Sequence, residues 1–155
     1  MSQLEVIVQK ADFDPGALQH ALLSGRHEEG ALATFTGYVR ANNDNRGVSR
    51  MLLEHYPGMT EKSIEATLGE AAQRWAIGSA MALHRVGELI PGDRIVWVGV
   101  TSSHRAEAFA ACEFIMDYLK TRAPFWKKEL GPDGESWVEA RDSDEARARR
   151  WTQAD

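Results

Sequence analysis

One stretch decides the fold of this chain: Thr101-Ser-Ser-His-Arg-Ala-Glu-Ala-Phe-Ala-Ala-Cys-Glu-Phe-Ile-Met-Asp-Tyr-Leu-Lys-Thr-Arg-Ala-Pro-Phe-Trp-Lys-Lys-Glu129. It predicts a long helix near residues 103–122. Ser102 or Ser103 can accept hydrogen bonds from the free amides of the first turn, and Glu107 is available for a capping box if Ser103 or His104 begins the helix. Pro124 ends the helix because a proline disfavours helical backbone at the residue before it. The helical spacing predicts a buried face of Ala108, Cys112, Ile115 and Leu119.

The end of this helix runs into a cluster of cations. Four of them lie within nine residues, with no carboxylate among them: Lys120, Arg122, Lys127 and Lys128. Neighbouring cations lower the pKa of a lysine and make its neutral amine more nucleophilic at pH 7. The adjacent Phe125 and Trp126 can partly desolvate the ammonium groups. The cluster is therefore either a solvated basic edge or an anion site, and its charge alone does not choose between them.

A second candidate anion site lies at the start of the same helix. His104 and Arg105 stand in its first turn, where free amides and the helix dipole already attract anions. They precede Lys120 by 16 and 15 residues, which corresponds to about 22–24 Å at the helical rise. No small substrate spans that distance. Either the two ends serve different functions, or a symmetric dimer brings them together, one from each copy. We expect the dimer, because both ends carry anion-binding residues. Arg40, at the exit of a predicted strand, is a third candidate.

The remaining segments predict a mixed α+β fold. A helix is expected over 17–23 and another from Thr60 to Gly78, and the polar segment 41–47 should be a loop. Val96, Val98 and Val100 alternate with other apolar residues, which predicts a central strand. The side chains of Phe35, Phe109 and Met116 are expected in the core, and Trp151 should anchor a helical tail. Predicted strands cover residues 4–9, 31–39, 49–56, 80–88, 94–101, 125–130 and 136–140.

The composition excludes several classes of function. A net charge of −5 argues against general nucleic-acid affinity. No segment has the roughly 18 apolar residues of a membrane span, and the first residues lack the features of a signal peptide, so we expect a cytoplasmic protein without a membrane partner. The single Cys112 excludes an intrachain disulfide and a cysteine zinc cluster. The histidines show no metal-ligand spacing and the glycines no nucleotide-binding motif, so no metal or cofactor is expected.

Five ordered motifs resemble the large, catalytic subunit of the molybdopterin synthase family, over most of the chain from about Leu4 to Trp151. They are Ala33-Thr-Phe-Thr-Gly-Tyr-Val-Arg40, Leu53-Glu-His-Tyr-Pro-Gly-Met59, His84-Arg-Val-Gly-Glu-Leu89, Gly99-Val-Thr-Ser-Ser-His-Arg105 and Phe114-Ile-Met-Asp-Tyr-Leu-Lys-Thr-Arg-Ala-Pro-Phe-Trp-Lys-Lys-Glu129. The resemblance implies an α/β-hammerhead fold with a mostly antiparallel sheet. It also implies a single domain over residues 1–150 with a C-terminal tail at 151–155.

The resemblance further implies an enzyme of molybdenum cofactor biosynthesis. Members of the family convert cyclic pyranopterin monophosphate to molybdopterin by adding two sulfurs as a dithiolene. The sulfur arrives as a thiocarboxylate on the C-terminal Gly-Gly of a small ubiquitin-like subunit, whose tail enters a pocket of the large subunit. The large subunits form a central homodimer within a heterotetramer. A sulfur supplied by the partner fits a chain whose only cysteine is expected to be buried.

The resemblance also implies roles for individual residues. Lys120 corresponds to the principal catalytic lysine and Lys127 to its partner, acting on the substrate either electrostatically or by covalent attack on a carbonyl. The implied substrate-binding residues are Tyr38, Val39, Arg40, His104, Arg105, Lys120, Lys127, Lys128 and Glu129. Tyr38 replaces a basic residue that relatives have, so its backbone is the part expected to serve.

Two alternatives remain at the level of the sequence. A non-catalytic dimeric module would bind a phosphorylated ligand, or a ubiquitin-like protein, through the same basic pocket. A lysine Schiff-base lyase would act alone through Lys120, without a small subunit.

Overall fold

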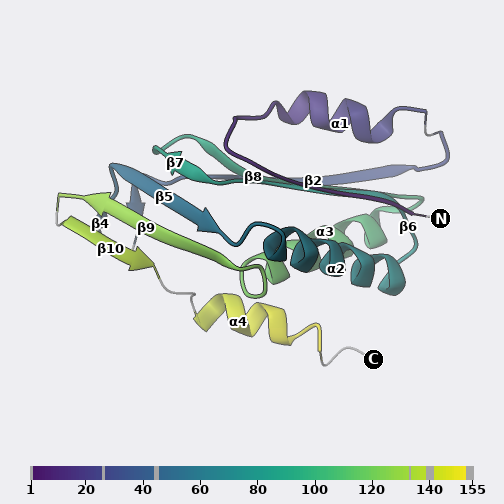
Figure 1. The fold of residues 1–155 in the computed structure, drawn as a ribbon. Coiled ribbons are helices and arrows are strands. Elements are labelled where there is room, and N and C mark those ends of the chain that lie inside the picture. The colour runs from purple at the N-terminus through teal and green to yellow at the C-terminus, as the bar shows by residue number, and fades with distance from the viewer. Residues whose placement is uncertain (1, 26, 44–45, 133, 139–141, 153–155) are drawn as a thin grey trace.

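The computed structural model describes residues 2–25, 27–43, 46–132, 134–138 and 142–152. Its strands form two four-stranded sheets and one short pair (Figure 1). The first sheet has the order β1 (Gln3–Gln9), β6 (Ile77–Arg85), β8 (Arg94–Ser102), β2 (Ala31–Tyr38). The second has the order β10 (Gly134–Val138), β9 (Phe125–Gly131), β5 (Arg50–His55), β7 (Gly87–Leu89). Because only β1 and β6 run parallel among the described strand pairs, the predicted mostly antiparallel α+β fold is confirmed.

Helices cover both faces of the first sheet. In Figure 1, α1 (Pro15–Leu23) lies on one side of it, and α2 (Met59–Arg74) and α3 (Arg105–Leu119) lie on the other. β8 is an inner strand, as predicted, and its alternating side chains pack against the helices on the two faces of the sheet. Val96, Val98 and Val100 join the core under α2 and α3, whereas Trp97 packs with Leu22 of α1. No helix within the described residues is long and apolar enough to cross a membrane.

The helix predicted near residues 103–122 is α3, with shorter limits. Its buried face of Ala108, Cys112, Ile115 and Leu119 is confirmed. The expected serine cap is wrong, because His104 is the N-cap residue and makes no side-chain capping bond. The Ser102 hydroxyl instead donates to the carbonyl of Ala76 at 2.7 Å, which ties the end of β8 to the loop before β6. Lys120 is the C-cap residue.

Two predicted boundaries are wrong for local reasons. The strand expected over 80–88 ends at Arg85, and the chain changes sheets to form β7 from Gly87. Gly87 has a φ of 91°, a left-handed conformation that glycine adopts without strain. Helix α2 ends at Arg74 rather than near Gly78, because Trp75 turns to extended backbone and the chain enters β6 at Ile77.

Other corrections concern the loop and the aromatic residues. The segment predicted as a loop forms two short paired strands, β3 (Asn42–Asn43) and β4 (Arg46–Gly47), and residues 44–45 between them lie outside the described residues. Met116 is buried as expected, but Phe35 and Phe109 are 43% and 65% exposed. Phe35 lies on the edge strand β2 and Phe109 on the part of α3 beside that edge, so helical or strand periodicity alone did not reveal their exposure.

The C-terminal helix α4 (Asp142–Arg149) is held against α3 by a buried carboxylate. Asp117 is 6% exposed and accepts hydrogen bonds from Arg147 Nε at 3.2 Å, Arg150 Nη2 at 3.1 Å and Trp151 Nε1 at 2.7 Å. The Trp151 ring packs in the aromatic cluster that includes Trp75 and Phe114, with ring centroids 5.5 and 5.6 Å away. The predicted anchoring role of Trp151 is therefore confirmed.

Trp151→Ala should lower the free energy of unfolding by about 2–3 kcal/mol, because it removes a large aromatic contact and leaves Asp117 with one donor fewer. Trp151→Phe keeps the ring contacts and loses only the indole hydrogen bond, so its cost should be about 1 kcal/mol. Urea unfolding of both variants measures the difference. Wild-type stability in Trp151→Ala would show that this anchor contributes nothing to the fold.

Candidate active site

A cavity of about 500 Å³ lies between the two sheets, at the C-terminal end of α3. The end of β2, the strands β6 and β8, the last turn of α3, and β5 and β9 all contribute to its wall. Most of the predicted site residues line it: Tyr38, Val39, Arg40, Lys120, Lys127 and Glu129. The fold thus brings the residues after β2, which precede Lys120 by about 80 positions, to the lysine cluster.

The other predicted site residues lie elsewhere. His104 and Arg105 are exposed at the opposite end of α3 and do not line this cavity. Lys128 faces away from it, because alternate side chains of a strand point to opposite faces of the sheet. Its ammonium pairs with Glu135 at 2.8 Å and lies 5.4 Å from the centre of the Trp137 ring. One chain therefore places Lys127 and Lys128 in two different environments.

Among the lysines that line the cavity, Lys127 is the one whose pKa is changed most by its surroundings. β9 directs Phe125, Lys127 and Glu129 toward the cavity. Burial of the amine is the largest cause that lowers the pKa of Lys127, to about 8, and the charge and hydrogen bonding of Lys120 lower it further. The carboxylates of Asp144 and Glu129 oppose this effect only in part. A substantial fraction of Lys127 is therefore a neutral amine near pH 8.

A chain of hydrogen bonds positions Arg40 at the cavity. Asn43, in β3, is buried and donates through Nδ2 to both carboxylate oxygens of Glu129, each at 3.1 Å. Arg40 in turn donates through Nη2 to Asn43 Oδ1 at 3.4 Å. Asn43 was missed in the sequence, where it was one of several polar residues in a predicted loop. Its contact with Glu129 joins positions 86 residues apart, which no local pattern reveals.

His84 and Phe125 form an aromatic wall of the cavity. Their rings stack with centroids 4.0 Å apart and planes inclined by 23°. Burial is the largest cause that lowers the pKa of His84, to about 3, and the charges of Lys127 and Lys120 add to it. His84 is therefore neutral at pH 7. The alternation that directs Lys127 into the cavity also predicts Phe125 beside it, but no sequence signal distinguished His84.

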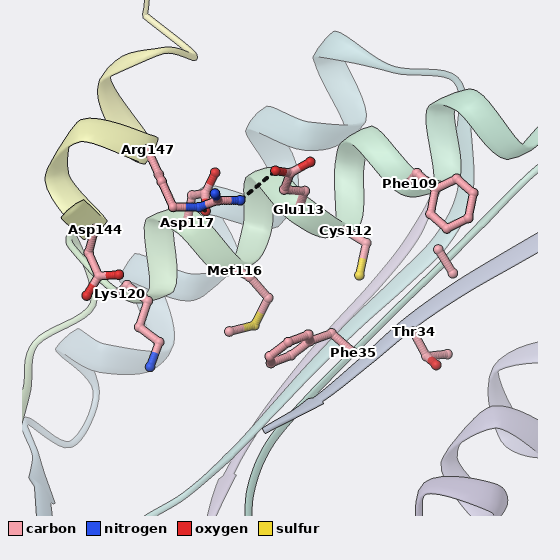
Figure 2. A pocket seen from close by; sticks show the side chains of 11 residues that line it. Thr34, Phe35, Phe109, Cys112, Glu113, Met116, Asp117, Lys120, Asp144 and Arg147 are labelled. Atoms are coloured by element: carbon pink, nitrogen blue, oxygen red, sulfur yellow. Dashed lines mark hydrogen bonds and ion pairs between the residues drawn. The ribbon is translucent and has the colours of Figure 1, made fainter. Parts of the chain in front are cut away.

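A second cavity, also of about 500 Å³, continues from Lys120 along α3 (Figure 2). It lies between α3, the edge strand β2 and the start of α4, and the side chains of Phe35 and Met116 point toward each other across it. Lys120 lines both cavities. Cys112 also lines the second one, but burial and then the charge of Glu113 raise the pKa of its thiol to about 12. The thiol is thus protonated at neutral pH and is a poor nucleophile.

The combination of charges and rings suits a planar, anionic ligand. Arg40, Lys120 and Lys127 supply cations for phosphate or carboxylate groups, and the wall of His84 and Phe125 supplies an apolar surface. Among the residues that the structure describes, no group of His, Cys, Asp or Glu side chains could hold a metal ion. The neutral amine of Lys127 can take a proton or attack a carbonyl carbon.

Comparison with known proteins identifies the family. The family model described as MoaE protein matches residues 8–122, well over half of the chain. The chain belongs to the MoaE family. It is 54% identical to the molybdopterin synthase catalytic subunit of Salmonella typhimurium over 151 residues, which are 97% of this chain and 100% of the relative. The resemblance inferred from the five motifs is therefore confirmed.

Solved structures of MoaE proteins share the fold. The molybdopterin biosynthesis MoaE protein from Burkholderia ambifaria superimposes with a TM-score of 0.82 at 51% identity, covering 98% of this chain and 99% of that chain. A molybdopterin synthase structure from Staphylococcus aureus gives a TM-score of 0.78 at 28% identity, covering 90% of this chain and 98% of that chain. The fold class predicted for the chain is thus that of the MoaE family.

Proposed function

We propose that this chain is the catalytic subunit of a cytoplasmic molybdopterin synthase, a sulfurtransferase that converts cyclic pyranopterin monophosphate to molybdopterin. The observation that carries the proposal is the paired environment of Lys120 and Lys127. Both amines line one cavity with Arg40, and the pKa of Lys127 is lowered to about 8. A site of this kind binds an anion and offers a neutral amine at the same time. Membership of the MoaE family supplies the reaction.

The sulfur donor is a thiocarboxylate at the C-terminal glycine of a small ubiquitin-like subunit. In each of two transfers, a carbon–sulfur bond forms at a carbon of the pterin side chain and a carbon–oxygen bond at that carbon breaks. Water then cleaves the acyl carbon–sulfur bond, which leaves the sulfur on the pterin and the glycine as a carboxylate. The second cavity lies beside the edge strand β2, which supports a route for an extended tail along this strand to Lys120. The thiol of Cys112, which lines this second cavity, is protonated at neutral pH. This supports a sulfur supplied by the partner rather than by this chain.

The positions of individual residues support the roles that we assign to them. Lys120, where the cavities meet, contacts both the substrate and the sulfur donor. Lys127 supplies the neutral amine, and Arg40, with the backbone at Tyr38 and Val39, binds the substrate beside it. Glu129 acts through Asn43 by holding Arg40 in place. His104 and Arg105 serve the site of a second copy of the chain, as members of a homodimer, and bind the phosphate there.

Reconstitution tests the proposal directly. The purified chain, supplied with thiocarboxylated small subunit and cyclic pyranopterin monophosphate, should form the dithiolene product, detected after oxidation as a fluorescent pterin. If both ligands bind and no dithiolene forms, the non-catalytic binding module is the correct description. Trapping of the substrate on Lys120 by borohydride in the absence of the small subunit would instead indicate a Schiff-base lyase. The geometry favours the synthase because two cavities meet at one lysine.

The rate should depend on pH through Lys127. Below its pKa of about 8 the amine is protonated and inactive as a base or nucleophile, so kcat/KM should rise with pH and level off above pH 8. One unit below that pKa only about a tenth of the amine is neutral, so kcat/KM at pH 7 should be about a tenth of the plateau. The charged and titratable groups around Lys127 are Arg40, His55, His84, Lys120, Glu129 and Asp144.

Lys128→Ala provides the control for this profile, because Lys128 faces the other side of the sheet. Its kcat/KM should follow the same curve. A wild-type profile that is flat from pH 6.5 to 9, or that falls through pH 8, would contradict a role for the neutral amine of Lys127.

A further inference from the structure

His84 has no role in the proposed reaction, yet it occupies a central place in the wall of the cavity. It stands near the end of β6 and is 9% exposed. Its ring stacks on Phe125, which precedes Lys127 by two residues on the same face of β9. The inference that follows rests on the proposed function, because it concerns how the same cavity recognises its substrate.

The hydrogen bond of the ring fixes its tautomer. His84 Nδ1 lies 2.8 Å from the backbone carbonyl of Arg85. A carbonyl oxygen only accepts hydrogen bonds, so Nδ1 must carry the proton and donate it. A neutral imidazole has one N–H, which leaves Nε2 as an acceptor. The ring is neutral because it is buried beside Lys127 and Lys120, whose charges disfavour a third cation.

The acceptor atom of His84 is open to the cavity. Across the described ranges, Nε2 makes no hydrogen bond with another residue, since the single bond of this side chain is through Nδ1. In the same residues, Tyr118 Oη is the only fully buried side-chain nitrogen or oxygen without a partner. Nε2 is therefore not fully buried, and the surface it reaches is that of the cavity that His84 lines.

The other polar groups of the wall offer a contrast. Arg40, Lys120 and Lys127 are cations that suit phosphate and carboxylate groups. The carboxylate of Glu129 already accepts hydrogen bonds from Asn43. An uncharged acceptor on an aromatic wall suits a different part of a ligand, namely a planar heterocycle that carries N–H groups.

We propose that His84 is a specificity-determining residue of the synthase, whose Nε2 accepts a hydrogen bond from a ring N–H of the pterin while charged groups elsewhere in the site bind the phosphate. The stack on Phe125 holds the imidazole plane, and the bond to the Arg85 carbonyl holds its tautomer. A ligand without an N–H at this point leaves the acceptor unpaired. Sites built on such hydrogen bonds discriminate strongly against analogues that lack the donor.

Three substitutions of His84 distinguish the effect of the Nε2 acceptor from the effect of the aromatic stack. His84→Phe keeps the stack and removes both nitrogens, and His84→Asn keeps a donor for the Arg85 carbonyl without an atom at the Nε2 position. In the reconstituted synthase both should raise KM for cyclic pyranopterin monophosphate about three- to tenfold, with kcat changed less than about twofold. His84→Gln, whose amide oxygen can reach the Nε2 position, should bring KM back to within about threefold of wild type.

The outcomes are decisive in both directions. Unchanged KM in His84→Phe and His84→Asn would overturn the proposal. So would a His84→Gln variant as impaired as His84→Phe, because the shape of the wall would then explain the loss. Urea unfolding of each variant separates damage to the fold from damage to recognition.

A spectroscopic measurement on the wild-type chain needs no turnover and no small subunit. The ¹⁵N shifts of the His84 ring, assigned by comparison with His84→Phe, should show a protonated Nδ1 and a bare Nε2. Addition of cyclic pyranopterin monophosphate should move the Nε2 signal and leave Nδ1 in place. A protonated Nε2, or an Nε2 signal that stays fixed at saturating ligand, refutes the inference even if the synthase is active. A bound ligand with no dithiolene formed on reconstitution refutes the proposed function instead.

Discussion

Lys127→Ala is expected to reduce kcat at least about a hundredfold, whereas Lys128→Ala should stay within about twofold of wild type. The two lysines are neighbours in sequence with opposite surroundings. Lys127 lies in the cavity, where burial and Lys120 lower its pKa to about 8. Lys128 pairs with Glu135 on the other face of the sheet. Steady-state kinetics of the reconstituted synthase, with saturating thiocarboxylated small subunit, measures both.

A conservative variant shows which property of Lys127 matters. Lys127→Arg keeps the positive charge but cannot supply a neutral amine, because a guanidinium stays protonated in proteins. We expect it to be nearly as inactive as Lys127→Ala. Full activity of Lys127→Arg would show that the residue acts through charge alone. Equal losses in Lys127→Ala and Lys128→Ala would contradict the division of roles between the two faces of β9.

The helix and the cation cluster could be predicted because they depend on local sequence. Helical spacing located the buried face of α3, Pro124 set a limit that the helix does not pass, and the cluster of cations marked the candidate site. The alternation of a strand already separates Lys127 from Lys128. The family motifs predicted that both lysines bind the substrate, because a sequence motif does not state which face of a strand each residue occupies. The structure supplies that distinction.

The rest of the cavity could not be predicted, because it depends on contacts distant in sequence. Asn43 meets Glu129 only when β3 lies beside β9, and His84 meets Phe125 only because the two sheets adjoin at the end of β6. The change of sheets at Gly87 was hidden inside one continuous predicted strand. Phe35 was expected in the core, yet it lies on β2, which the fold places at the edge of its sheet.

Mixing an inactive homodimer with a strongly impaired one should restore activity if the site is shared between protomers. His104 and Arg105 stand at the start of α3 and Lys120 at its end, about 22–24 Å apart at the helical rise. We expect Lys120→Ala to be inactive and Arg105→Ala to be strongly impaired, because a phosphate contact is lost. After exchange of subunits, about half of the dimers are mixed, and each has one intact site and one site with both defects. The mixture should therefore reach about a quarter of wild-type activity.

The matched control is a mixture of Lys120→Ala with Lys127→Ala. Both residues line the same cavity of one protomer, so a mixed dimer of these variants has no intact site and should remain inactive. Native mass spectrometry with one variant isotopically labelled verifies that subunits exchange in both mixtures. If mixed dimers form and the first mixture stays inactive, Arg105 does not complete the site of the other protomer. Recovery in the first mixture alone would assign Lys120 and Lys127 to one protomer and Arg105 to its partner, because only that arrangement leaves an intact site in one mixture and none in the other.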